Sequence, residues 1–181
     1  MAYERVREMA ELGLPGFAIG FVAGTVAGLM ALVVGQPWSW AVIAAATLAI
    51  PLGLLGGTYS VLIALGKVRI GGFAPVCLFW LLAFPLARLL QEVLTWLILT
   101  GKPELPPKIA GFLALQAMIS AGFAIGYLWL HERIAPQWWR KVSEHNPLAQ
   151  RIYETYASHA RSMWEAREAR RARNRRTPSR R

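Results

Sequence analysis

Residues 16–28 read GFAIGFVAGTVAG, with glycine at every fourth position. Because residues four apart lie on nearly the same face of an α-helix, Gly16, Gly20, Gly24 and Gly28 form one smooth stripe. In water this stripe would weaken the helix, since each interior glycine costs about 0.5–1 kcal/mol relative to alanine. In a bilayer, small residues let a second helix approach closely. The stretch therefore predicts helices that pack together in lipid.

This stretch lies in the first of four long apolar segments. The chain has 181 residues, of which 55% are hydrophobic. About 20 helical residues cross the hydrocarbon core of a bilayer, and the four segments, near 13–34, 40–65, 73–99 and 109–130, are all long enough. We predict an all-α integral membrane protein, with a four-transmembrane-helix bundle over 1–131 and a basic tail over 132–181.

Lysine and arginine are distributed unevenly between the two sides of the predicted bundle. The N-terminus, the second loop and the tail hold seventeen of them, whereas the other two loops hold only Lys102 and Lys108. Positive residues concentrate on the cytoplasmic side of a membrane. We therefore expect a multi-pass protein of the cytoplasmic (inner) membrane with both termini in the cytoplasm. The mixed charges before the first span argue against a cleavable signal peptide.

Small residues also recur at four-residue spacing in the second and fourth spans. The positions predicted to pack there are Ala45, Ala49, Gly53, Gly57, Gly122 and Gly126. Residues 122–126 repeat the GFAIG of residues 16–20. We interpret this repeat as two helices that independently use small residues for close packing. We expect the glycine stripe to be covered within one chain, with homo-oligomerisation as the alternative.

Several polar residues fall at a similar depth in the predicted bundle. Placing a charge near the centre of a bilayer costs at least about 2.5–3.5 kcal/mol, so such residues tend to face the interior and to be functional. Arg88 and Glu92 are one turn apart and are expected to pair. The predicted cluster consists of Thr47, Arg88, Gln91, Glu92 and Gln116.

Three interpretations of this polar cluster remain open. The first is a neutralised pair that fixes helix register or docks on a partner protein. The second is a site for a quinone, a lipid headgroup or a proton. In the third, the span boundary is shifted and Arg88 reaches the interface. No resident cofactor is expected, although bound lipid or quinone fits the second interpretation.

No catalytic motif is present in the sequence. His131-Glu132 lacks the second histidine of a zinc-binding HExxH helix, and the three histidines are interpreted as isolated surface residues. The single cysteine, Cys77, excludes an intrachain disulfide or a cysteine metal cluster. We therefore expect neither a metal site nor enzymatic activity.

The tail is predicted to form an amphipathic helix near 147–173. Asn146-Pro147 is a good N-cap followed by a first helical residue, and eight arginines lie in the last fifteen residues. The sequence indicates a helix on the inner membrane surface, bound to anionic lipid or to a cytoplasmic protein, with nucleic acid ranked third. The expected interface residues are Trp138, Trp139, Arg140, Lys141, Ile152, Tyr156, Met163, Trp164, Arg167, Arg170 and Arg171.

Three classes of function follow from these observations. The first is a non-catalytic accessory subunit that packs against a larger membrane complex through its spans and basic tail. The second is a small oligomeric carrier or channel that uses the Arg88/Glu92 level, and the third is a lipid- or quinone-binding membrane enzyme. The overall plan resembles small accessory subunits of bacterial respiratory supercomplexes, as a likeness of architecture without a shared residue motif.

Overall fold

The chain is described by a computed structural model over residues 2–176, and within this range it contains helices but no strands. Four of the helices are long and apolar enough to cross a membrane. The elements are α1 (Ala2–Leu29), the short 3-10 helix η1 (Met30–Leu32), α2 (Trp38–Ala64), α3 (Phe73–Thr100), α4 (Ile109–Val142) and α5 (Pro147–Arg176).

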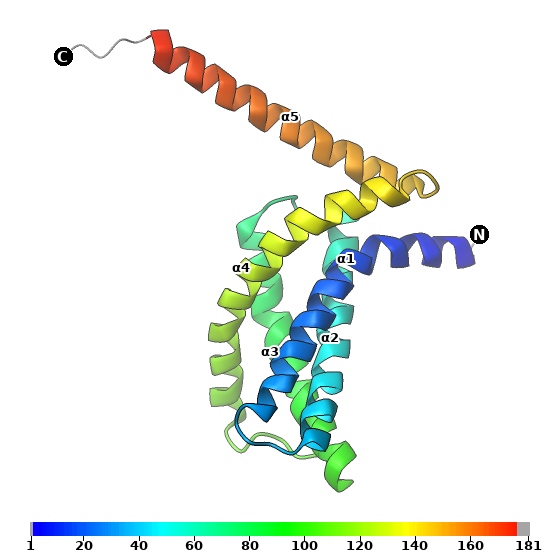
Figure 1. The fold of residues 1–181 in the computed structure, drawn as a ribbon, viewed down its shortest axis with the longest axis vertical. Helices are drawn as coiled ribbons and strands as arrows, with labels where there is room; N and C mark the ends of the chain where they lie inside the picture. Colours follow the sequence, from blue (N-terminus) through cyan, green and yellow to red (C-terminus); the bar gives the residue numbers. More distant parts are fainter. Residues whose placement is uncertain (1, 177–181) are drawn as a thin grey trace, which may run out of the picture.

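The helices α1 to α4 form an up-and-down bundle (Figure 1). Their connections are short, and glycine supplies the left-handed turns; for example, Gly101, at φ +75°, ends α3 and donates its N–H to the Leu97 carbonyl. We call the end formed by the start of α1, the α2–α3 loop (65–72) and α5 the basic end of the bundle. The α1–α2 and α3–α4 loops form the opposite end.

The glycine stripe of α1 packs directly on α2. A Cβ atom added at Gly24 would lie 2.5 Å from the Cα of Ala49, and one added at Gly20 would collide with the Leu52 carbonyl. A Cβ atom at Gly16 would likewise collide with Gly56, and one at Gly28 with Ala45. The two backbones are therefore in contact, and a side chain in this stripe would separate them. The seam lies inside one chain.

The glycines of the fourth span, α4, do not pack against α1 or α2. A Cβ at Gly122 or Gly126 would meet nothing within 4 Å in the described part of the chain, and both residues are exposed. The prediction that these two glycines pack within the bundle is therefore wrong for a single chain. Their side of α4 faces outward because the opposite side carries the aromatic residues of the core.

An aromatic core joins α2, α3 and α4. Trp80 of α3 is fully buried and lies 4.6 Å from the Phe123 ring and 4.8 Å from the Tyr127 ring of α4, measured between ring centroids. Tyr59 of α2 completes the cluster at 5.5 Å from Tyr127. Large rings in mutual contact occupy the space between helices that lack a small-residue seam.

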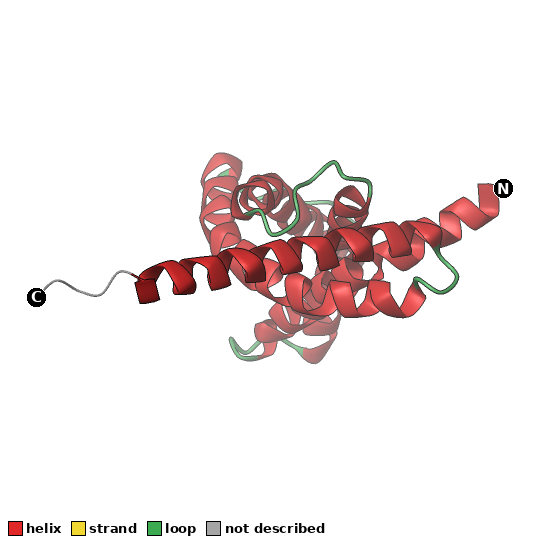
Figure 2. Ribbon diagram, turned by 90° about the horizontal axis from the view of Figure 1, so that it is seen from above, coloured by secondary structure: helices red, strands yellow, loops and turns green. Residues whose placement is uncertain are grey.

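The last helix, α5, lies across the basic end of the bundle (Figures 1 and 2). The preceding helix α4 continues without interruption from Ile109 to Val142. The boundary expected between the transmembrane bundle (1–131) and the tail (132–181) therefore falls inside α4. The last turns of α4 form part of the basic end. The final five residues of the Arg-rich tail, 177–181, lie outside the described residues.

Candidate functional site

The polar cluster predicted in the outer half of the bundle, which we call the polar level, lies on α2, α3 and α4. It consists of Thr47, Arg88, Gln91, Glu92 and Gln116. Arg88, near the middle of α3, donates from Nε to Oε1 of Gln116 on α4 over 3.3 Å. Arg88 is half-buried, whereas Gln116 is buried. This bond ties α3 to α4 at the depth where the sequence places both residues.

The expected ion pair between Arg88 and Glu92 is not formed. Among the described residues, no N···O contact of 4 Å or less joins the guanidinium to a carboxylate. Glu92 instead accepts a hydrogen bond from Nε1 of Trp96, one turn along α3, over 3.4 Å. The i, i+4 pair is lost because Arg88 extends across the helix seam toward Gln116. The guanidinium therefore lies inside a candidate span with an uncharged partner.

A second contact of the polar level joins Thr47 of α2 to α3. The hydroxyls of Thr47 and Thr95 are 2.9 Å apart and buried. Gln91 is buried, and its Oε1 has no hydrogen-bond partner in the described part of the chain. The predicted cluster thus separates into an α3–α4 contact and an α2–α3 contact, and Thr95 is a member that the sequence interpretation omitted.

A second polar group lies near the basic end, around a bend in α1 that Figure 1 shows. Pro15 has no N–H, so the Glu11 carbonyl, four residues earlier, loses its helical donor. The N–H of Gly16 donates to Oγ of Ser60 over 3.1 Å, and this Oγ lies 2.7 Å from Nε2 of His131. We call these residues, with Trp138 and Trp139, the kink network.

Two adjacent tryptophans of α4 cap the carbonyls at this bend. Nε1 of Trp138 donates to the Glu11 carbonyl over 2.7 Å, and Nε1 of Trp139 donates to the Leu12 carbonyl over 3.1 Å. Trp139 is 0% exposed. The interpretation as a membrane-interface anchor is therefore wrong for Trp139, whose ring is buried, whereas Trp138 is half-buried and stays a predicted interface residue.

His131 is buried, and its interpretation as a surface residue is wrong. Its ring stacks on Tyr127 at 5.6 Å and meets Trp139 edge-on at 5.8 Å, and its Nδ1 has no partner among the described residues. Ser60 and His131 form a hydroxyl–imidazole pair, yet both are 0% exposed. No substrate reaches this pair in the described conformation, so the pair acts as part of the packing between α1, α2 and α4.

The turn between α4 and α5 is fastened to the start of α1. Oδ1 of Asn146 accepts the N–H groups of Leu148 and Ala149, which is the N-cap that the sequence predicts. Nδ2 of the same side chain donates to the Glu8 carbonyl over 3.1 Å and to the Glu11 carboxylate over 3.0 Å. One fully buried side chain thus starts α5 and joins it to α1.

The first half of α5 packs on the protein's own bundle. Ile152 and Tyr156, expected at a membrane or partner interface, are buried there. The Tyr156 hydroxyl donates to Oε1 of Glu132 over 3.0 Å. Burial raises the pKa of Tyr156, so this phenol stays protonated and remains the donor. The interface expectation is therefore wrong for Tyr156, which α4 covers, whereas Ile152 still lines a groove between α5 and the end of α2.

The second half of α5 extends away from the bundle (Figure 1) and is exposed. Met163 and Trp164 are 49% and 60% exposed, although they continue the apolar side of the helix. The remaining predicted interface residues, Arg140, Lys141, Arg167, Arg170 and Arg171, are exposed as well. This segment is a basic helix with an uncovered aromatic residue, which suits binding to a surface outside the chain.

The kink network was missed by the sequence interpretation although one signal for it was present. Pro15 stands immediately before the glycine stripe, and a proline inside a long helix frees one carbonyl. Nothing in the spacing of the sequence indicates that Trp138 and Trp139, more than 120 residues later, supply the donors. No group of three His, Cys, Asp or Glu side chains that could hold a metal occurs among residues 2–176.

Comparisons with known proteins add no relative: no family model matches the chain, and no curated protein or solved structure matches it. Evidence for function therefore comes from the residues of this chain.

Proposed function

We propose that this chain is a non-catalytic accessory subunit of the inner membrane that docks on a larger membrane complex. The observation that carries the proposal is Arg88, a half-buried guanidinium near the middle of a candidate span whose hydrogen-bond partner is the uncharged amide of Gln116. A charge at this depth is costly unless a counter-charge is close. Glu92 on the same helix attracts Arg88 without touching it, and a carboxylate on a neighbouring subunit would supply a direct ion pair.

The surroundings of Arg88 support a docking role. Leu81, two turns before Arg88 on the same side of α3, is 45% exposed, and its neighbour Leu78 is 65% exposed. Exposed leucines beside a guanidinium give a face that is apolar at its periphery and charged at one point, so a partner helix would gain packing and one specific ion pair. The uncovered second half of α5 offers a further contact at the basic end.

The test is purification of the tagged full chain from its host membranes in a mild detergent. We expect a larger assembly to co-purify stoichiometrically with the wild-type chain and with Arg88→Lys, which keeps the charge. Arg88→Gln should lower the yield of that assembly by about tenfold, since an interaction with a charged group contributes about 1.5–3 kcal/mol. A lone homo-oligomer from wild-type membranes would contradict the proposal.

Loss of folding must be separated from loss of docking in this experiment. Thermal unfolding of each purified variant, followed by circular dichroism, provides the separation. A matched control is Arg133→Gln on α4, which removes an exposed arginine that lies over the Trp129 ring. We expect this control to keep the assembly intact. Equal loss in Arg88→Gln and Arg133→Gln would show that Arg88 has no special part in docking.

A further inference from the structure

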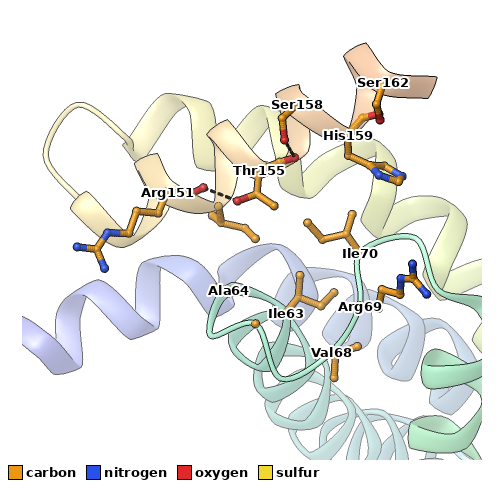
Figure 3. A pocket seen from close by; sticks show the side chains of 12 residues that line it. Ile63, Ala64, Val68, Arg69, Ile70, Arg151, Thr155, Ser158, His159 and Ser162 are labelled. Atoms are coloured by element: carbon orange, nitrogen blue, oxygen red, sulfur yellow. Dashed lines mark hydrogen bonds between the residues drawn. The ribbon is translucent and has the colours of Figure 1, made fainter. Parts of the chain in front are cut away.

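A groove lies at the basic end, between α5 and the α2–α3 loop (Figure 3). Its volume is about 650 Å³, within the range of small-ligand sites in proteins. The groove is separate from the polar level, which lies near the middle of the spans. Besides His159, it has three kinds of lining side chain, and each of these three selects a different part of a ligand.

The floor of the groove is aliphatic. Ile63 at the end of α2, Ile70 in the α2–α3 loop and Ile152 of α5 supply most of it. Ile63 marks the place where the apolar span ends and the loop begins. The floor is thus at the boundary between the hydrocarbon and the headgroup region expected for this end of the bundle, where the glycerol and first acyl carbons of a phospholipid lie.

Two arginines also line the groove. Arg69 comes from the α2–α3 loop and Arg151 from α5, and Figure 3 shows them at opposite ends. Both are exposed, and neither forms an ion pair within 4 Å in the described part of the chain. Glu132 of α4 accepts the Tyr156 hydroxyl, and Glu154 of α5 accepts from the Gln150 amide. The groove therefore offers guanidinium groups to a phosphate.

Between the arginines, a row of hydroxyl groups follows one side of α5. Thr155, Ser158 and Ser162 each donate their proton to a carbonyl of their own helix, namely those of Arg151, Thr155 and His159. Their oxygens consequently keep lone pairs for a ligand that has donors. A headgroup with free hydroxyls satisfies them, whereas a headgroup without any donor leaves them unpaired.

From these three surfaces we infer that the groove is a binding site for an anionic phospholipid with a hydroxylated headgroup of the phosphoglycerol type. The phosphate lies against a guanidinium, the headgroup hydroxyls donate to the serine and threonine oxygens, and the glycerol backbone covers the isoleucine floor. Such a lipid fixes α5 to the membrane surface and to the α2–α3 loop at the same time. This inference does not depend on docking to a partner complex.

The test uses the purified full chain in detergent with an equimolar mixture of phosphatidylglycerol and phosphatidylmethanol, which carry equal net charge and differ in the headgroup hydroxyls, and native mass spectrometry of the bound lipid. We expect phosphatidylglycerol to be retained preferentially. Arg69→Gln and Arg151→Gln should each weaken retention by about fivefold, the effect of one basic residue near an anionic surface. Arg140→Gln, which removes an exposed arginine outside the groove, is the matched control.

A second pair of substitutions isolates headgroup recognition from charge. Thr155→Val with Ser158→Ala keeps both arginines and should abolish the preference for phosphatidylglycerol while leaving total lipid binding unchanged. Equal retention of the two lipids by the wild-type chain would overturn the inference, as would equal loss with Arg140→Gln. Because no partner protein is present, failure here leaves the docking proposal standing, and failure of docking leaves this site standing.

Discussion

At the scale of single residues, the seam between α1 and α2 depends on the missing side chains of its glycines. Gly24→Ala places a Cβ 2.5 Å from the Cα of Ala49, so the two backbones must separate. We expect a loss of about 1–3 kcal/mol, the usual cost of overpacking, measured by reversible unfolding in mixed micelles. Gly122→Ala is the control, since open space surrounds Gly122 in the described chain. Equal destabilisation by both would contradict the seam.

The caps on the bend in α1 can be tested with one substitution. Trp139→Phe keeps an aromatic ring but removes the N–H that donates to the Leu12 carbonyl. Leaving a buried carbonyl without its donor should cost about 1–3 kcal/mol. Trp129→Phe, which alters a tryptophan that is 61% exposed, should cost much less. The comparison requires unfolding curves for both variants in the same detergent, and similar midpoints would show that the indole bond contributes little.

At the scale of the elements, Asn146 determines whether α5 is held to the bundle. Asn146→Asp keeps an N-cap acceptor but loses the donors to Glu8 and Glu11, and it places a carboxylate beside that of Glu11. Asn146→Ser keeps a cap without the added charge. We expect faster hydrogen exchange over 147–156 in Asn146→Asp than in Asn146→Ser. Unchanged exchange in both variants would mean that other contacts hold α5.

The elements also show how far sequence reasoning reaches in this protein. Helical spacing and apolar length were sufficient for the four spans and for the N-cap of α5, because these depend on neighbours within a few residues. Of the contacts between distant segments, the glycine seam within one chain was predicted, whereas the specific side-chain pairs were not. Trp139 resembles an interface anchor until the bend at Pro15 supplies an acceptor, and Arg88 resembles a partner of Glu92 until Gln116 lies beside it.

At the scale of the whole molecule, the excess of lysine and arginine at one end predicts its orientation. We expect single cysteines at Glu144 and Ser162 to be protected from an impermeant thiol reagent in intact cells, and one at Lys102 to be labelled, all in a Cys77→Ser background. Permeabilised cells, in which all three sites should react, provide the control. Labelling of Ser162→Cys in intact cells would reverse the proposed orientation.

Photo-crosslinking in native membranes shows whether the face around Arg88 docks on another protein. A photoreactive residue at Leu81, exposed on α3 two turns from Arg88 and on the same side, is compared with one at Leu54, exposed on α2. We expect a crosslink from position 81 to a different membrane protein, lost in the Arg88→Gln background, and none from position 54. Crosslinks from position 81 to lipid or to a second copy of this chain alone would contradict docking.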